Sequence, residues 1–85
     1  MKCEEYNNVC VLTPGGDFVA EETAAARKSI EELIDKKHLT DFVFDFEKTT
    51  FIDSEGLETL LWVKRRCEDL FGQVKLVNQI GRAHV

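Results

Sequence analysis

The chain has little proline, no paired-cysteine motif and no long apolar run. One Pro and five Gly in 85 residues, with 44% hydrophobic and 32% charged residues, are the composition of a globular protein and argue against disorder or a fibrous repeat. No apolar run approaches the roughly 20 residues that span a bilayer, and none follows the first five residues to form a secretory signal. We therefore expect a single cytoplasmic domain without membrane insertion.

The cysteines Cys3, Cys10 and Cys67 are odd in number and lack a Cys-x-x-Cys spacing. This predicts reduced thiols and neither a disulfide framework nor a zinc site. The glycine pair Gly15-Gly16 lacks both the Lys-Ser/Thr of a P-loop and the third glycine of a dinucleotide fingerprint, so we expect no cofactor. The 11 basic and 16 acidic residues give a formal charge of -5, which repels phosphate backbones and excludes nucleic acid as an expected partner.

Hydrophobic periodicity predicts the element order β-β-α-β-α-β. Two short strands about Asn7-Asn8 are followed by an amphipathic helix, an aromatic strand, a second helix and an alternating strand. Two strand-helix-strand units imply right-handed crossovers into a mostly parallel sheet flanked by helices, an α/β fold. The expected ranges are 2–6 and 9–13 for the first two strands, 20–37 for the first helix, 42–46 for the third strand, 54–71 for the second helix and 73–77 for the last strand.

The second helix is predicted to have one apolar side about 180° wide. Trp62 is off that side among charged residues, and a Trp on a polar face is a candidate anchor for a binding partner. Alternatively, Trp62 packs on a neighbouring loop or is simply exposed. The predicted apolar side contains Leu57, Leu60, Leu61, Val63, Cys67, Leu70 and Phe71.

Asp45 is the polar exception in the aromatic strand. A carboxylate near the end of a buried strand is costly unless it is hydrogen-bonded or faces solvent, so we expect it at the carboxyl end of the strand, near the loop at Asp53-Ser54. The alternative is a structural role, in which Asp45 anchors a loop by accepting hydrogen bonds from backbone N–H groups.

The stretch 51–57, where a buried strand leads into the second helix, is the centre of the predicted site. Asp53 and Ser54 are both good helix N-cap residues, because a short side-chain oxygen can accept from the unpaired N–H groups of the first turn. Capping does not explain Gly56, which weakens a helix by about 1 kcal/mol relative to Ala. A glycine is useful where another backbone or a partner must come close.

These segments together resemble the STAS domain, the family named for sulfate transporters and bacterial anti-sigma-factor antagonists. The resemblance covers about residues 9–78 and is carried by the aromatic strand at 42–46, the Asp-Ser-x-Gly-Leu motif at 53–57, the leucine-rich helix behind it and the strand at 73–77. It implies a sheet of four or five strands flanked by helices, continuing with a third helix, a short strand and a closing helix.

The resemblance implies that Ser54 is phosphorylated by a serine kinase that is also the anti-sigma factor. The unphosphorylated form would bind this kinase and free the sigma factor, and a PP2C-type phosphatase would reset the switch. Asp53, Ser54, Glu55, Gly56 and Trp62 are the expected partner-binding residues, with Gly56 letting the kinase approach the hydroxyl. Phosphate adds roughly -1.5 to -2 charges at a surface that the partner must cover.

The chain departs from the family pattern after the last predicted strand. Residues 79–85 do not read as the start of a third helix, and 80–85 can be back-translated to the opening of a widely used sequencing adapter. We expect an incomplete STAS domain over 1–78 and a non-native or disordered tail over 79–85.

Three alternatives remain at this point. An enzyme would use Ser54 as a nucleophile assisted by Asp53 or Asp45, but His38 and His84 are distant in sequence and no Gly-x-Ser-x-Gly elbow occurs. We therefore expect no enzymatic activity. A STAS docking subunit of a stressosome or of a lipid-transport (ABC) assembly would use the same fold, and an inactive fragment would follow from truncation.

Overall fold

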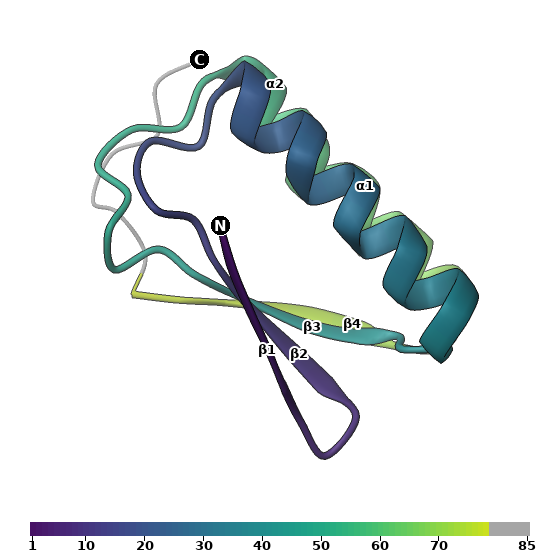
Figure 1. The fold of residues 1–85 in the computed structure, drawn as a ribbon. Helices are drawn as coiled ribbons and strands as arrows, with labels where there is room; N and C mark the ends of the chain where they lie inside the picture. Colours follow the sequence, from purple (N-terminus) through teal and green to yellow (C-terminus); the bar gives the residue numbers. More distant parts are fainter. Residues whose placement is uncertain (79–85) are drawn as a thin grey trace.

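The structure, a computed structural model, describes residues 1–78. Within this range the chain forms two layers, a mixed sheet and a pair of helices that cover one of its faces (Figure 1). The tail predicted at 79–85 lies outside the described residues.

The predicted element order and the α/β class are confirmed. The described elements are β1 (Lys2–Tyr6), β2 (Val9–Thr13), α1 (Ala20–Lys37), β3 (Asp41–Asp45), α2 (Ser54–Asp69) and β4 (Gln73–Val77). Within residues 1–78 the sheet has four strands in the order β1-β2-β3-β4. β1 is antiparallel to β2, whereas β3 is parallel to both β2 and β4, so the sheet is mostly parallel as expected.

The hairpin between β1 and β2 turns at Asn7 and Asn8. Their φ angles are 48° and 69°, in the left-handed region that asparagine tolerates better than other non-glycine residues. The register pairs Tyr6 with Val9 and Lys2 with Thr13, so the whole of β1 is paired.

The core lies between the sheet and the helices. Phe42 and Phe44 project from β3 into it and are almost completely buried. Phe18, Phe44 and Phe46 form an aromatic cluster with ring centroids 5.8 to 5.9 Å apart. Because Phe18 belongs to the loop before α1 and Phe46 to the loop after β3, this cluster joins both loops to the sheet.

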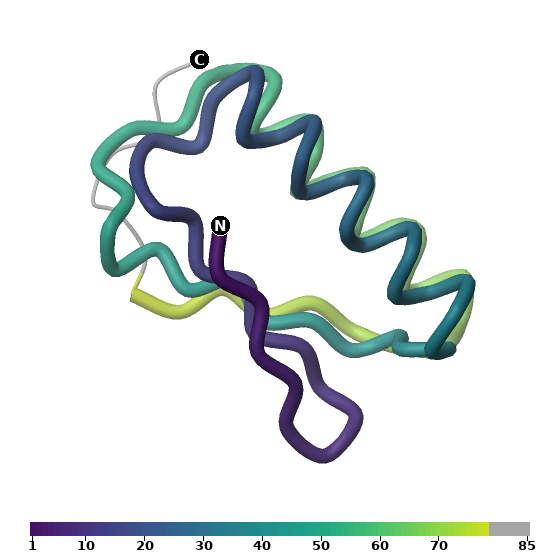
Figure 2. Tube along the Cα trace, in the orientation of Figure 1, coloured from purple at the N-terminus to yellow at the C-terminus, as the bar shows by residue number. Residues whose placement is uncertain are grey.

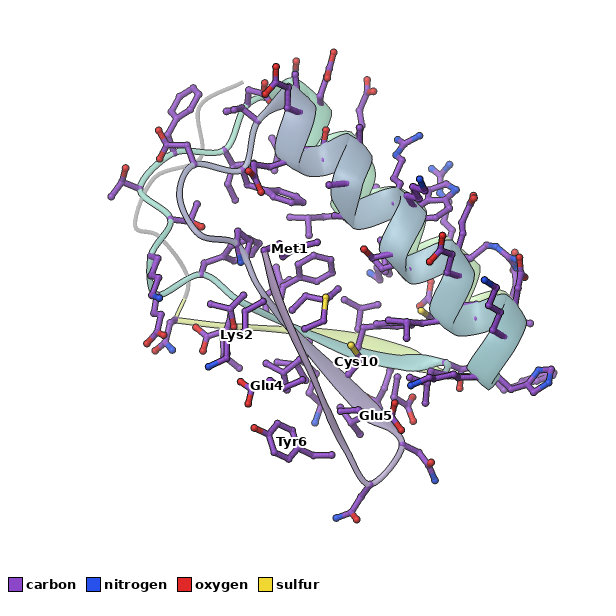
Figure 3. All side chains as sticks on the ribbon, viewed as in Figure 1. Met1, Lys2, Glu4, Glu5, Tyr6 and Cys10 are labelled. Carbon is purple, nitrogen blue, oxygen red and sulfur yellow. The ribbon has the colours of Figure 1, made fainter. Side chains whose placement is uncertain are left out.

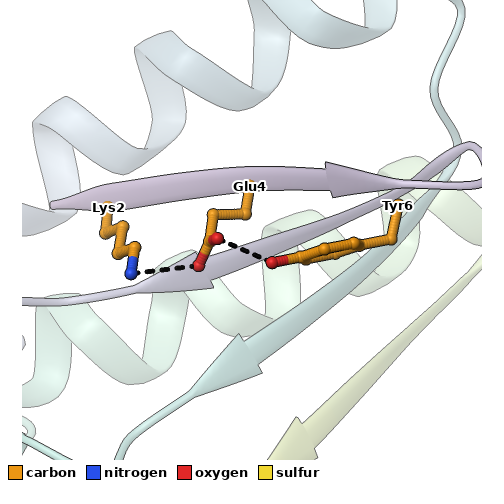
Figure 4. A network of polar contacts seen from close by, with 3 residues as sticks. All are labelled: Lys2, Glu4 and Tyr6. Carbon is orange, nitrogen blue, oxygen red and sulfur yellow. Dashed lines mark hydrogen bonds and ion pairs between the residues drawn. The ribbon is translucent and has the colours of Figure 1, made fainter.

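The other face of the sheet carries polar side chains on β1. Lys2, Glu4 and Tyr6 point away from the helices (Figure 3). The Tyr6 hydroxyl donates to Glu4 Oε2 at 2.6 Å, and Lys2 Nζ lies 3.2 Å from Glu4 Oε1 (Figure 4). The hydrogen bond to Tyr6 lowers the pKa of the Glu4 carboxyl and raises the pKa of the Tyr6 hydroxyl.

α1 packs as its sequence predicts. Its buried residues are Thr23, Ala26, Ile30 and Ile34, a single stripe at helical spacing. The helix ends at His38, whose φ of 57° turns the chain and whose N–H donates to the Ile34 carbonyl at 3.0 Å. His38 is thus a helix-end residue.

The predicted apolar side of α2 is wrong in part. The buried residues of α2 are Gly56, Thr59, Val63 and Cys67, whereas Leu61 is 56% exposed. Small residues at 56 and 59 let the first turns of α2 approach the core closely, and this rotates the leucines towards its flank. Helical spacing alone could not show which part of a wide apolar arc faces inward.

α2 also ends earlier than predicted, at Asp69, and Phe71 is not part of its buried side. Phe71 is 98% exposed and has a φ of 64°, a left-handed conformation that costs a non-glycine residue about 1–2 kcal/mol. The next residue, Gly72, cannot be exchanged for a larger one, because a Cβ there would lie 1.9 Å from the Thr40 carbonyl oxygen. The chain therefore uses its glycine for close packing and a phenylalanine for the turn.

The buried thiols predict a loss of stability at alkaline pH. Burial raises the pKa of Cys10 and of Cys67 from 9.0 to about 11. The folded chain holds these thiols in the protonated form more strongly than the unfolded chain does. Their contribution to the free energy of unfolding should therefore be fully present below pH 9 and be lost as pH rises from 9 towards about 11. Urea unfolding across this window measures the decrease. A Cys67→Ala variant should show a shallower decrease, and identical slopes would contradict the assignment.

Candidate functional site

The loop after β2 leads into α1, and the loop after β3 leads into α2. The two loops lie side by side (Figure 2) and are connected by hydrogen bonds. Thr49 Oγ1 donates to the Gly16 carbonyl at 2.8 Å, and Thr50 Oγ1 donates to Asp17 Oδ1 at 2.9 Å. The Phe18 N–H donates to the Phe51 carbonyl at 3.0 Å, and Phe18 and Ile52 form a parallel bridge. These contacts build a braced platform at the end of the sheet where α/β folds place their sites.

Asp53 connects the two helix N-termini. Its Oδ1 caps α2 by accepting from the Gly56 N–H at 2.8 Å, and its Oδ2 lies 3.4 Å from the Ala20 nitrogen in the first turn of α1. The N-cap of α1 is Val19, which has no side chain able to cap. The Asp53 carboxylate therefore serves both helices and holds their starting points together. The prediction that Asp53 caps α2 is confirmed.

Ser54 is the first residue of α2, and its side chain is exposed. Within residues 1–78 no hydrogen bond holds its hydroxyl. It lies between Asp53 and the exposed Glu55, at a helix end where backbone N–H groups and the helix dipole favour negative charge. The hydroxyl is therefore open to another molecule and placed where an added anion is tolerated.

Gly56 is buried against the platform. A Cβ at this position would lie 2.5 Å from the Phe18 carbonyl oxygen and 2.6 Å from Ile52 Cγ2. Of the two explanations open from the sequence, close approach of another backbone is the one that the structure shows. Close packing of the Phe18 loop requires this glycine, with or without a partner.

Trp62 lies more than two turns along α2 from Ser54, about 12 Å at 1.5 Å per residue. It is half-buried and packs against the core, and the Arg27 guanidinium lies 5.3 Å from its ring centroid. Arg27 Nε also donates to Thr59 Oγ1 at 3.1 Å. The expectation that Trp62 projects on the charged face is wrong in part, because α2 is rotated so that this ring faces α1.

Between the helices, next to Ser54, is a groove of about 260 Å³. The carboxylates of Glu55 and Glu58 and the guanidinium of Arg27 line it, so the surface beside the serine is polar and charged. Its complete lining is Ala20, Thr23, Ala24, Arg27, Glu55, Glu58 and Thr59.

Asp45 has the structural role that the sequence left as an alternative. Its Oδ1 accepts from the Glu47 N–H at 3.0 Å and from the Asn78 side-chain amide at 2.9 Å. It ties the loop after β3 to the end of β4 at the carboxyl end of the sheet, as expected.

Sequence reasoning missed the residues that brace the platform, Asp17, Thr49 and Thr50, and the role of Arg27. The two threonines come before the predicted site and Asp17 follows a strand break, but only the fold brings positions 33 residues apart into contact. In the part of the chain that the structure describes, no group of three His, Cys, Asp or Glu side chains could hold a metal ion, and no helix is long and apolar enough to cross a membrane.

Comparison with known proteins identifies the family. The family model described as the STAS domain matches residues 1–83. The chain belongs to the STAS domain family. No curated protein matches this STAS domain at a significant level.

Solved structures share its fold. The anti-sigma factor antagonist SpoIIAA in its unphosphorylated form superimposes with a TM-score of 0.82 and 24% identity, over 92% of this chain and 72% of that one. A structure described as Mglu superimposes with a TM-score of 0.78 and 16% identity, over 98% of this chain but only 20% of its own. The STAS domain fold therefore also occurs as a small part of a much larger chain.

Replacing Gly56 with Ala should destabilise the domain, although Ala is the better helix former. Helix propensity favours Ala by about 1 kcal/mol, but the new Cβ would overlap the Phe18 carbonyl, and overpacking costs about 1–3 kcal/mol. We expect a net decrease in the free energy of unfolding, measured with urea. Gly15→Ala is the matched control, because a Cβ there meets nothing within 4 Å. Equal stability of Gly56→Ala and the parent would contradict the packing role.

Proposed function

We propose that this STAS domain is an anti-sigma-factor antagonist. When Ser54 is unphosphorylated, the domain binds an anti-sigma factor that is also a serine kinase and so frees the sigma factor. Phosphorylation of Ser54 by that kinase ends the binding, and a PP2C-type phosphatase restores it. The domain acts in the cytoplasm, where the kinase draws on ATP.

The observation that carries this proposal is the exposed Ser54 hydroxyl at the start of α2, on a platform braced from both sides. A kinase needs a hydroxyl that it can reach, and this one is exposed at an ordered helix start. Asp53 holds the backbone beside the serine through the two helix N-termini, while the serine side chain itself stays open. The shared fold with the antagonist SpoIIAA supports the same conclusion.

Electrostatics explain how the modification would act as a switch. Phosphate adds roughly -1.5 to -2 charges between the carboxylates of Asp53 and Glu55. A poorly matched charge in an interface costs on the order of 2–5 kcal/mol, which is roughly 30-fold to several thousand-fold in affinity. The helix N-terminus accepts the same anion without unfolding. Phosphorylation would thus change the binding surface and leave the domain folded.

A binding module fits the geometry better than an enzyme does. A serine nucleophile needs a base within hydrogen-bond reach. His38 is at the far end of α1, which at 18 residues is about 27 Å long, and Asp45 is already engaged in the loop contact described above. Asp53 is committed to the two helix N-termini.

The proposed partner surface includes Asp53, Ser54 and Glu55, with the groove between the helices beside them. Gly56 contributes by fixing the position of this turn. Trp62 contributes beside the groove residue Arg27, whose guanidinium covers its ring.

Incubation with the cognate kinase and ATP tests the proposal. Mass spectrometry should find one phosphate, on Ser54. The phosphorylated domain should bind the kinase at least about 30-fold more weakly than the unmodified domain does. Ser54→Ala should bind and stay bound in ATP, whereas Ser54→Asp should fail to bind with an unchanged circular dichroism spectrum. Ser29→Ala, which alters the other serine of the chain, is the control. Tight binding by Ser54→Asp would refute the switch.

Replacing Trp62 with Ala separates a role in binding from one in packing. Because the ring is half-buried, we expect the free energy of unfolding to fall by about 2 kcal/mol, roughly half the cost of truncating a fully buried Trp. If Trp62 also contacts the kinase, affinity should weaken by more than about 1 kcal/mol under conditions where the variant is fully folded. Tyr6→Ala, on the opposite face of the domain, is the control. Unchanged affinity would assign Trp62 to packing alone.

A further inference from the structure

Asp53 links the turn that carries Ser54 to the first turn of α1 through one long contact. Its Oδ2 lies 3.4 Å from the Ala20 nitrogen, whereas its Oδ1 accepts from the Gly56 N–H at 2.8 Å. Val19, the N-cap residue of α1, provides no side-chain cap of its own. The start of α1 is therefore capped from another segment of the chain, and by the longer of the two contacts.

The chain is firmly held on both sides of Ala20. Before it, Phe18 is fully buried and its N–H donates to the neighbouring loop at 3.0 Å. After it, Thr23 is buried and its hydroxyl donates to the Ala20 carbonyl at 2.7 Å. Opening of the Asp53 contact would therefore loosen residues 19–22 without spreading into the loop or the core.

The side chains around this contact are acidic. The first turn of α1 carries Glu21 and Glu22, and Glu55 follows Ser54 on α2. Arg27, a cation that lines the adjoining groove, is already engaged by groups on α2. A phosphate on Ser54 would add roughly -1.5 to -2 charges to these carboxylates. Coulomb repulsion would then act against the contact that holds the two helix starts together.

We propose that phosphorylation of Ser54 opens the contact between Asp53 and Ala20 and releases the first turn of α1. This inference rests on the proposed function, in which the γ-phosphoryl group of ATP is transferred to Ser54 Oγ, ADP leaves and the hydroxyl proton is lost to solvent. The contact to α1 opens rather than the cap of α2 because it is the longer and weaker of the two. Ala20 and Thr23 line the groove beside the serine, so the modification changes both walls of the proposed partner surface.

A chain synthesised with phosphoserine in place of Ser54 tests the proposal without a kinase. Hydrogen exchange of the Ala20 and Thr23 amides, measured by NMR, should be at least about fivefold faster than in the unmodified chain. This is the effect of about 1.5 charges at a separation of about 6 Å in water. Thr23 reports on the turn because its N–H donates to the Val19 carbonyl at 3.1 Å. The Gly56 amide, at the cap of α2, should keep its protection.

The amides of Glu21 and Glu22 provide an internal reference. They lie in the first turn of α1, where N–H groups have no intrahelical acceptor, so they report how the added charge changes the intrinsic exchange rate. Ser29→Asp is the control for charge elsewhere on α1, because it adds a negative group at the other serine of the chain. It should leave exchange at Ala20 and Thr23 unchanged.

Ala20→Pro tests whether the Asp53 contact carries the effect. Proline removes the N–H that reaches Asp53 but suits the first position of a helix, and Val19 before it already has the extended backbone that a proline requires, with φ -129° and ψ 171°. Phosphoserine in this variant should no longer accelerate exchange at Thr23.

Three results would overturn the proposal. These are equal exchange at Ala20 and Thr23 in the modified and unmodified chains, slower exchange because the phosphate replaces Asp53 as the acceptor, and equal acceleration in the Ala20→Pro chain. None of them bears on whether a kinase modifies Ser54, which the incubation with kinase and ATP decides separately.

Discussion

The Asp53 carboxylate is the contact on which the candidate site depends. One oxygen caps α2, and the other reaches the first turn of α1, whose own N-cap residue, Val19, has no capping side chain. Two positive helix ends are thereby brought to one point and share one negative group. Ser54 is the next residue, so its backbone is fixed at this point, whereas its side chain stays exposed. The packing of Gly56 against Phe18 brings the two segments close enough for this arrangement.

Much of this fold could be predicted from the sequence, because its elements are short, strongly patterned and bounded by clear signals. The Asn7-Asn8 turn and the α1 stripe ending at Ile34 are local features, and local pattern was sufficient for them. The orientation of α2 was not predictable in the same way. Its apolar residues cover half of the helix surface, and the small residues Gly56 and Thr59, which carry little hydrophobic signal, decide which part faces inward.

The same distinction applies to the site. Asp53 and Ser54 could be found from the sequence because cap residues lie next to the helix that they begin. Arg27 could not be found, since its partners Thr59 and Trp62 lie on another helix more than 30 positions away. The role of Trp62 depended on the same long-range contact: a ring that projects among charged residues in a helical projection is covered in the fold by the guanidinium of its neighbour.

The bracing contacts have a further consequence for how a modifying enzyme meets this chain. Gly16 with Thr49, Asp17 with Thr50 and Ala20 with Asp53 are each 33 positions apart, and they form only when β2 and β3 are aligned in parallel around α1. A nascent or unfolded chain contains the serine but not the surface around it. An enzyme that recognises this surface would therefore modify folded molecules and not unfolded ones. A modified molecule would then be one that had already folded.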